Sequence, residues 1–373
     1  DRSEIGDLVF GALRWRQSSA YRFGEDTPRA WVLGAARWGF AGETEWIDAR
    51  CGHGEHAAAA LSDAERAALN EQTPSSRLES APAWVRGDYP EWMEASFVRA
   101  FGDKRAEEGA ALARPAPLDL RANTLCSTRE RVIEALGEAP ALEGPPDPTP
   151  YAPDGVRVPW RRGRSFQWAA QPTFVKGWYE VHDEGSQLAA LWCGAQPGMQ
   201  VADVCAGAGG KTLALAAQMQ NKGQIYAFDV DGARLIPLPE RLTRAGVRNV
   251  QIRAPQRTRD ILNDLRGKMD IVLADAPCTG SGTWRRNPDA KWRVTANALE
   301  SRLEEQREAL AMSARLVKPG GKLVYVTCSV LPEENEDQVA AFVKANPEFK
   351  PESLGVENVP AYKRGEALQL TPL

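Results

Sequence analysis

Two of the six cysteines, Cys278 and Cys328, stand where a thiol could do chemistry. Each comes at the end of a short apolar run, 269–274 or 322–327, of the kind that forms a buried parallel strand. Open α/β sheets bind ligands at the carboxyl ends of their strands, so both thiols are expected at the mouth of one crevice. Elsewhere a buried cysteine usually packs as a small apolar side chain, and this interpretation stays open for Cys51, Cys126, Cys193 and Cys205.

A thiolate can add reversibly to an electron-poor ring carbon, and C6 of cytosine is one such carbon. The addition makes the neighbouring C5 nucleophilic. A free thiol titrates at about 8.5 and is only slightly ionised at neutral pH, so a reactive site must lower the pKa of its cysteine. The sequence therefore indicates a pyrimidine-directed reaction, without ranking the two thiols.

A glycine-rich turn, DVCAGAGGKT, runs from Asp203 to Thr212. A phosphate-binding P-loop ending at this threonine would need glycine at position 205, where the chain has Cys205. A dinucleotide fingerprint beginning at Gly207 would need glycine at position 212. Both alternatives fail on spacing. What remains is an acid-x-C-x-G-x-G turn, whose small residues let the backbone approach an adenosyl-amino-acid ligand closely.

A downstream acid completes this cofactor pattern. Asp229 ends the next apolar run, 224–229, where a carboxylate can accept hydrogen bonds from both hydroxyls of a ribose. A strand, a turn, a helix and a distal acid thus follow one another in the order that a nucleoside site needs.

Taken together, these segments resemble the Sun (Fmu) family of S-adenosylmethionine-dependent RNA (cytosine-5)-methyltransferases, in its bacterial ribosomal-RNA branch. The resemblance extends from about Leu118 to Phe349. The motifs that carry it are LDLRANT at 118–124, VHDEGSQ at 181–187, the glycine turn, DAPCTGSG with RRNPDAKW in 275–292, and TCSVLPEENE at 327–336.

The resemblance implies a role for each site residue. Cys328 would be the nucleophile, Cys278 would assist breakdown of the covalent adduct, and Asp275 would hydrogen-bond the flipped base near N3, where negative charge builds up. The cofactor would be S-adenosylmethionine, held by Cys205, Ala206, Gly207, Ala208, Gly209, Gly210, Lys211, Asp229 and Asp275. Two departures concern the cofactor: Ala208 replaces the family's usual proline, and Ala254 stands where many members carry an adenine-contacting Asp.

An RNA partner requires local positive charge, because the formal net charge of the chain is −4. Cations alternate with aromatic residues in 157–166 and again in 284–293. Arginine can pair with phosphate while aromatic faces stack on unpaired bases, although a solvated charged loop is the alternative for the first stretch. The predicted RNA-binding residues are Arg161, Arg162, Arg285, Arg286, Lys291 and Arg293.

Residue periodicity predicts three regions. Residues 1–112 show helical spacing, with Ser62 as a candidate N-cap, in the place of the family's NusB-like RNA-binding bundle, divergent or shortened here. Residues 113–180 are expected to form a small α/β cap. In 181–373 strands and helices alternate, which predicts an α/β fold with a doubly wound, mainly parallel sheet, the Rossmann-like domain of the resembled family.

Composition is consistent with a reducing cytoplasm. The cysteines are irregularly spaced rather than arranged as a disulfide framework, and no apolar run of about 18 residues predicts a membrane span. The segment CGHGEH at 51–56 suggests metal ligands, but no second ligand pair stands at suitable spacing, so no metal is predicted. We expect a monomer.

The sequence thus predicts an enzyme that methylates C5 of a cytosine in RNA, with small-subunit (16S) ribosomal RNA as the expected substrate. Transfer RNA is the alternative substrate, and a non-catalytic RNA-binding ribosome-assembly factor is the alternative class, although such a factor could discard both thiols. An N6-adenine methyltransferase would need an Asn/Asp-Pro-Pro-aromatic loop where this chain has DAPC at 275–278.

Overall fold

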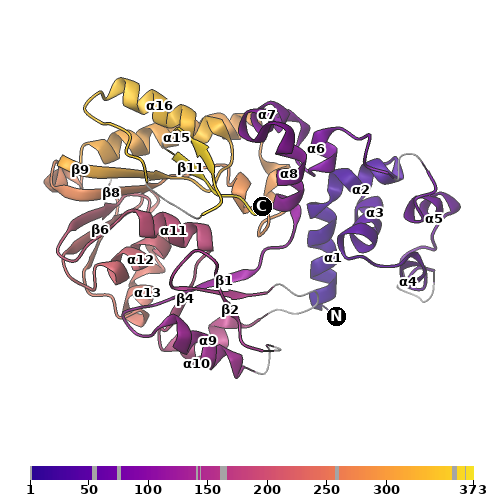
Figure 1. The fold of residues 1–373 in the computed structure, drawn as a ribbon, viewed down its shortest axis with the longest axis horizontal. Helices are drawn as coiled ribbons and strands as arrows, with labels where there is room; N and C mark the ends of the chain where they lie inside the picture. The colour runs from indigo at the N-terminus through magenta and orange to yellow at the C-terminus, as the bar shows by residue number, and fades with distance from the viewer. Residues whose placement is uncertain are drawn as a thin grey trace.

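The structure of the chain is a computed structural model. It describes residues 2–52, 57–73, 77–139, 142, 144–159, 166–256, 260–354, 359–365 and 367–373. The chain forms a helical N-terminal lobe, a small mixed cap and a larger lobe built on a parallel sheet (Figure 1). Among the described residues, no helix combines the length and the apolar character needed to cross a membrane.

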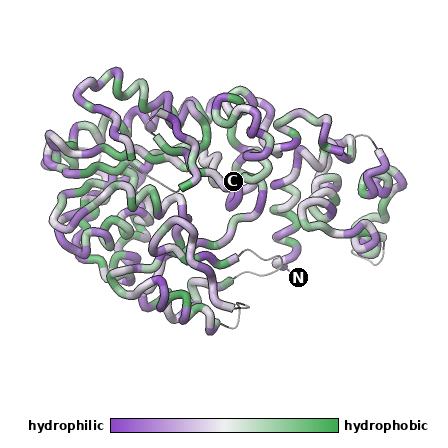
Figure 2. Tube along the Cα trace, in the orientation of Figure 1, coloured by the Kyte–Doolittle hydropathy of each residue, from purple (hydrophilic) through white to green (hydrophobic). Residues whose placement is uncertain are grey.

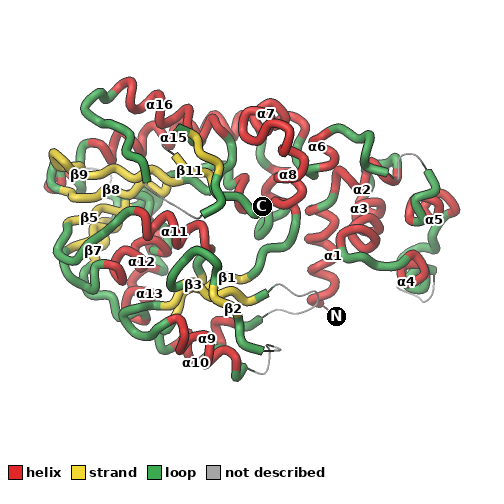
Figure 3. Tube along the Cα trace, viewed as in Figure 1, coloured by secondary structure: helices red, strands yellow, loops and turns green. Residues whose placement is uncertain are grey.

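The N-terminal lobe is made of short helices, and its described residues contain no extended strand (Figure 3). Ser62 caps one of them in a capping box with Glu65, so the predicted N-cap is confirmed. Hydrophilic and hydrophobic residues alternate along the helices, as expected where one face packs inward (Figure 2). The helices are α1 (Arg2–Arg14), α2 (Arg16–Phe23), α3 (Pro28–Gly34), α4 (Thr44–Asp48), α5 (Asp63–Leu69), α6 (Ala83–Arg86), α7 (Glu94–Phe101) and α8 (Arg105–Ala113), with the short turns η1 (Ala35–Gly39), η3 (Glu91–Met93) and η4 (Gly102–Lys104).

The cap is an antiparallel sheet of order β2-β3-β1-β4, packed against two helices. Its strands are β1 (Leu118–Ala122), β2 (Asp147–Pro148), β3 (Gly155–Val158) and β4 (Tyr179–Val181), and its helices are α9 (Arg129–Gly137), α10 (Pro172–Val175) and the 3-10 turn η5 (Trp168–Ala170). Leu120, Val156 and Tyr179 are fully buried at its centre. β4 is the last strand of the cap, and the chain passes from it directly into the larger lobe at α11 (Glu184–Trp192).

The larger lobe contains a five-stranded parallel sheet of order β7-β6-β5-β8-β9, so the predicted α/β fold is confirmed. The strand order reverses between β5 and β8, which is where sheets of this type bind ligands. The strands are β5 (Gln200–Asp203), β6 (Gln224–Phe228), β7 (Val250–Arg253), β8 (Met269–Asp275) and β9 (Val317–Val326).

Helices cover both faces of this sheet. One face packs on α15 (Ala296–Ala314), through a cluster that includes Ala309 and Val272. The other face packs on α12 (Gly210–Gln218), through a cluster that includes Leu215 and Ile271, and α12 is joined to α11 where Gln218 donates to the carbonyl of Ala190 at 3.0 Å. The remaining elements are α13 (Leu238–Arg244), α14 (Ala290–Arg293), α16 (Glu336–Ala345), the hairpin β10 (Tyr362–Arg364) and β11 (Ala367–Gln369), and the short turns η6 (Gly232–Leu235), η7 (Asn263–Leu265), η8 (Ser281–Thr283) and η9 (Pro332–Glu334).

One detail of the sequence-based expectation was wrong. The run 322–327 was expected to be a buried strand, but the described residues of β9 are only partly buried or exposed. In the described part of the chain β9 pairs with β8 alone and lies at the edge of the sheet, where one side lacks a neighbouring strand.

Candidate active site

The two predicted thiols meet at the carboxyl edge of the sheet. β8 and β9 are neighbours in parallel register, with Asp275 paired to Val326, so the loops that follow them start side by side. The Sγ atoms of Cys278 and Cys328 lie 3.2 Å apart, within hydrogen-bond distance for sulfur. Cys328 is exposed and Cys278 is partly buried.

The pair is electrostatically unequal. The hydrogen bond shared with Cys278 lowers the pKa of the Cys328 thiol against the opposing effects of partial desolvation by the surrounding loops and of the Asp275 charge, and the ammonium of Lys211 lowers it further. That same hydrogen bond, together with burial, raises the pKa of Cys278 well above its usual range. The directions of these two shifts favour Cys328 as the thiol that ionises first, while the 3.2 Å contact itself allows either sulfur to be the donor.

Hydroxyl side chains join the two cysteine loops. The Oγ atoms of Ser281 and Ser329 lie 2.9 Å apart, and the backbone N–H of Gly282 donates to the carbonyl of Cys328 at 2.9 Å. Sequence analysis did not single out these residues. Their signal was small polar residues beside both cysteines, in TGSG and TCS.

Asp275 and Lys211 form an ion pair beside the thiols. The Nζ of Lys211 donates to Oδ2 of Asp275 at 2.7 Å. Burial alone would lower the pKa of Lys211, but the carboxylate of Asp275 raises it. The Lys211 side chain is only 9% exposed whereas that of Asp275 is 33% exposed, so the carboxylate is the member of the pair that a ligand could reach.

The glycine turn connects β5 to α12. Gly207 and Gly209 have φ values of 51° and 89°, in the left-handed region where a side chain would strain the backbone. The N–H of Gly207 donates to Oδ2 of Asp229 at 2.9 Å, so the predicted distal acid also holds the turn. Asp229 is 1% exposed, and Arg234 lies 3.3 Å from the same oxygen.

The turn fits an amino-acid cofactor. The first N–H groups of a helix have no acceptor within that helix, and α12 begins at Gly210, so its amides face the turn with partial positive charge. Asp203 is 1% exposed, its Oδ2 accepts from the Thr212 hydroxyl, and its Oδ1 has no hydrogen-bond partner among the described residues. Burial raises the pKa of Asp203 to about 7. Donors for a carboxylate and an acceptor for an ammonium group thus lie at one turn.

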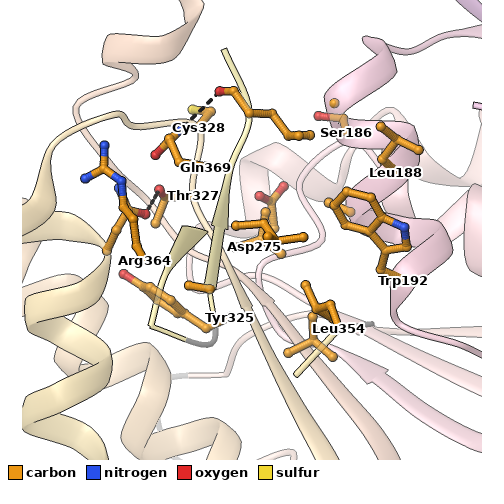
Figure 4. A pocket seen from close by; sticks show the side chains of 18 of the residues that line it. Ser186, Leu188, Trp192, Asp275, Tyr325, Thr327, Cys328, Leu354, Arg364 and Gln369 are labelled. Carbon is orange, nitrogen blue, oxygen red and sulfur yellow. Dashed lines mark hydrogen bonds between the residues drawn. The ribbon is translucent and has the colours of Figure 1, made fainter. Parts of the chain in front are cut away.

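A cavity of about 2060 Å³ opens beside these groups. Figure 4 shows Asp275, Thr327 and Cys328 on one side of it and Ser186, Leu188 and Trp192 of α11 on the other. Lys211 also lines the cavity. A large ligand can therefore reach the Cys328 thiol and the Asp275 carboxylate from one side.

The basic stretch 284–293 differs from what was predicted. Trp284 is 1% exposed and stacks on Phe97 of α7, with ring centroids 6.0 Å apart. Arg285 donates to the carbonyl of Pro115, and Arg286 donates to the carbonyl of Pro117 and to Asp183. Both arginines therefore hold the link between the N-terminal lobe and the cap, although Arg286 remains exposed.

The prediction that Lys291 binds RNA was wrong. Its side chain is 1% exposed, and its Nζ donates to the carbonyls of Arg14, at 2.6 Å, and Asp88, at 2.7 Å. Burial lowers the pKa of Lys291 to about 7. This lysine anchors the segment in the N-terminal lobe and cannot reach a phosphate.

The other predicted RNA contacts have two outcomes. The side chain of Arg293 is 75% exposed and forms an ion pair with Asp289, a few residues earlier in the same segment. Arg161 and Arg162 lie outside the described residues. Of the CGHGEH segment, residues 53–56 also lie outside them, and no cluster of three or more possible metal ligands occurs in the part that is described.

Comparisons with known proteins bear on this geometry. The family model of the 16S rRNA methyltransferase RsmB/F matches residues 190–373. A solved methyltransferase homolog protein from Pyrococcus horikoshii is 31% identical, with 71% of this chain and 81% of that chain covered and a TM-score of 0.59. The chain belongs to the Sun/Fmu family of methyltransferases. The resemblance seen in the sequence motifs is confirmed.

Further relatives agree with the family. A probable ribosomal RNA small subunit methyltransferase B from Synechocystis is 35% identical over 269 residues, which cover 71% of this chain and 58% of that protein. The chain spans less than two thirds of the length of the curated relatives it matches. The solved structure of PH0851, at 24% identity and a TM-score of 0.70 over 97% of this chain, has the same fold.

Proposed function

We propose that this protein transfers a methyl group from S-adenosylmethionine to C5 of a cytosine in small-subunit ribosomal RNA. The observation that carries the proposal is the contact between the two thiols, 3.2 Å apart, beside the Lys211–Asp275 ion pair. The names of the curated relatives, ribosomal RNA small subunit methyltransferase B, favour small-subunit ribosomal RNA as the substrate.

S-adenosylmethionine supplies an electrophilic methyl group when it is bound. The amides at the start of α12 would receive its carboxylate, and Asp203 and Asp229 would accept hydrogen bonds from its ammonium group and its ribose. The left-handed turn at Gly207 and Gly209 lets the backbone approach that ligand.

Cys328 would start the reaction. Its thiolate adds to C6 of the cytosine, a Sγ–C6 bond forms, and the electrons of the C5–C6 double bond become available at C5 to attack the methyl group. Negative charge grows on the ring toward N3 during this addition. Asp275, which stays reachable beside Lys211, would accept a hydrogen bond from a proton that N3 takes up from solvent, and so lower the barrier.

Cys278 would act in the release of the product. Its pKa is raised chiefly by the hydrogen bond with the Cys328 thiolate, and this effect ends once the Cys328 sulfur is bonded to C6. Cys278 can then lose its proton more easily and assist removal of the C5 proton. The C5–C6 double bond re-forms, the Sγ–C6 bond breaks, and Cys328 leaves as a thiolate.

The RNA would approach across the open side of the cavity. Arg293 and Arg286 are exposed cations of the 284–293 segment, and with Arg161 and Arg162 they remain candidates for phosphate contacts. Arg285 has its guanidinium on a backbone carbonyl of the interlobe link, so its contribution would be secondary.

The test is methyl transfer in vitro. The purified chain is incubated with S-adenosylmethionine and either unmodified 16S rRNA or unmodified transfer RNA, and 5-methylcytosine is mapped by bisulfite sequencing. We expect one protected cytosine in the ribosomal RNA and none with Cys328→Ala. A protected cytosine in transfer RNA alone would show that the proposed substrate is wrong. Binding of RNA without methylation of either the ribosomal or the transfer RNA would favour a non-catalytic assembly factor.

A further inference from the structure

Both chain neighbours of Cys278 are held by one buried pair of side chains, Glu334 and Gln306. The backbone N–H of Thr279 donates to Oε1 of Glu334 at 2.7 Å, and the Thr279 hydroxyl donates to Oε2. On the other side of the cysteine, Nε2 of Gln306 donates to the carbonyl of Pro277 at 2.9 Å and to Glu334 at 3.0 Å. Glu334 and Gln306 are both 0% exposed.

Both chain neighbours of Cys328 are held by Asn335, the residue that follows Glu334. The hydroxyl of Thr327 donates to Oδ1 of Asn335 at 2.6 Å. Nδ2 of Asn335 donates to the carbonyl of Ser329 at 3.0 Å and to that of Leu331 at 2.9 Å. One amide side chain therefore holds the Thr327 side chain on one side of the thiol and the Ser329 backbone on the other.

The turn that carries these two side chains is itself anchored. The hydroxyl of Tyr325, on β9, donates to the backbone carbonyl of Glu334 at 2.7 Å. The preceding residue, Glu333, faces the N-terminal lobe, where it accepts from Ser96 at 2.9 Å and Arg99 at 3.0 Å. Three consecutive residues thus bind three different segments, and only Glu334 and Asn335 reach the cysteine loops.

We propose that Glu334 is the positioning residue for Cys278 and Asn335 the positioning residue for Cys328, so that one turn sets the separation of the two thiols. A carboxylate that accepts from a backbone N–H and a hydroxyl makes strong, directional bonds. Reactive groups must be held within about 0.5 Å of the productive geometry, and a displacement of about 1 Å can slow a reaction by about 100-fold. The inference rests on the proposed division of work between the thiols.

The two positioning residues should give opposite defects. Loss of Glu334 frees the Cys278 loop, so the adduct should form but break down slowly. Loss of Asn335 frees the Cys328 loop, so the adduct should form slowly in the first place. A role in folding alone would produce the same defect in both variants.

The experiment follows adduct formation and decay with radiolabelled RNA and S-adenosylmethionine on denaturing gels. We expect Glu334→Ala to accumulate the adduct, with release slowed by at least about 10-fold, and Asn335→Ala to slow formation by at least about 10-fold. Glu333→Ala, which leaves both loops untouched, is the control and should match the wild type. Glu334→Gln should restore release, because the Gln oxygen can still accept from the Thr279 N–H and the Gln amide can donate to the Thr279 hydroxyl, whose proton can turn toward Ser329, 3.5 Å away.

Two nearly isosteric variants serve if an alanine variant does not fold. Thr279→Val removes one bond to Glu334 and should slow release, whereas Thr327→Val removes one bond to Asn335 and should slow formation. If Cys278→Ala accumulates the adduct but Glu334→Ala and Thr279→Val do not, the positioning inference is wrong. If Cys278→Ala itself accumulates none, the proposed roles of the thiols are wrong instead.

Discussion

The cysteine loops and the segment that follows them serve opposite purposes within a few residues. At 277–282 and 327–329 the side chains are small and polar, and Cys278 contacts Cys328, which lines the cavity. At 284–293 the chain enters the N-terminal lobe, where Trp284 stacks on Phe97 and Lys291 is enclosed by two carbonyls. Only Thr283 separates Gly282, which donates to Cys328, from the buried Trp284.

This difference suggests how the reactive edge is kept rigid while it stays open to a ligand. Few apolar contacts can form around a thiol that must meet a substrate, so the loops are fixed by hydrogen bonds among Thr279, Ser281, Ser329, Glu334 and Asn335. The adjoining segment is fixed by burial, in a cluster that joins residues of α7, α15 and the loop after β9. Variants in the two regions should therefore separate stability from chemistry.

The largest effect on stability is expected for Lys291→Met. The change leaves the carbonyls of Arg14 and Asp88 without a donor in a buried place and removes a charge near the Asp88 carboxyl. We expect the free energy of unfolding to fall by about 3 kcal/mol, measured by urea denaturation. Arg293→Met, at the exposed end of the same helix, should change it by less than about 0.5 kcal/mol. Equal stabilities would show that the segment is not anchored through Lys291.

At the reactive edge, Asp229→Ala should weaken cofactor binding. Hydrogen bonds to a charged group contribute about 1.5–3 kcal/mol, so the affinity for S-adenosylmethionine should fall about tenfold or more in calorimetry. Because Asp229 also accepts from Gly207, part of this loss reflects a loosened turn. Lys291→Met should keep the wild-type affinity at a temperature where it is folded. An unchanged affinity in Asp229→Ala would remove this residue from the site.

The pH dependence of adduct formation should report the ionisation of Cys328. A lowered pKa means that the Cys328 thiol ionises at a lower pH than a free thiol, so the rate of adduct formation should rise with pH, with its midpoint below the usual thiol range. Lys211→Met removes the nearby positive charge, which raises the pKa of Cys328, and should move the midpoint to a higher pH. Midpoints that coincide in the two proteins would show that Lys211 does not act on the thiol.

The smallest effect concerns RNA. If Arg293 neutralises one phosphate of a single strand, Arg293→Ala should flatten the log-log dependence of RNA affinity on salt by about 0.7. Lys291→Ala should leave that slope unchanged, because the Lys291 ammonium is enclosed by protein. If the slope changed in Lys291→Ala and not in Arg293→Ala, Lys291 rather than Arg293 would be the residue that contacts phosphate.

The positions of Cys278 and Cys328 could be predicted because topology alone fixes them. Parallel strands end at one edge of a sheet, and two residues at neighbouring strand ends must lie close together whatever surrounds them. The glycine turn and Asp229 follow the same rule at β5 and β6. These parts of the site depend on local patterns that the sequence displays.

The burial of Lys291 could not be predicted in this way. A lysine among arginines and tryptophans is usually solvated. The carbonyls that accept from Lys291 belong to Arg14 and Asp88, which precede it in the chain by 277 and 203 positions. The support from Asn335 was hidden for a related reason, since an asparagine before a helix is ordinarily taken for a cap. Tertiary contacts decide both cases, and no local pattern encodes them.

The most direct measurement compares Cys278→Ala and Cys328→Ala on denaturing gels with radiolabelled RNA and S-adenosylmethionine. We predict a denaturation-resistant protein–RNA complex for Cys278→Ala, no complex for Cys328→Ala, and no complex for the double variant, because formation must precede release. The opposite pattern, with the complex trapped in Cys328→Ala, would contradict the assignment of Cys328 as the nucleophile and give that role to Cys278.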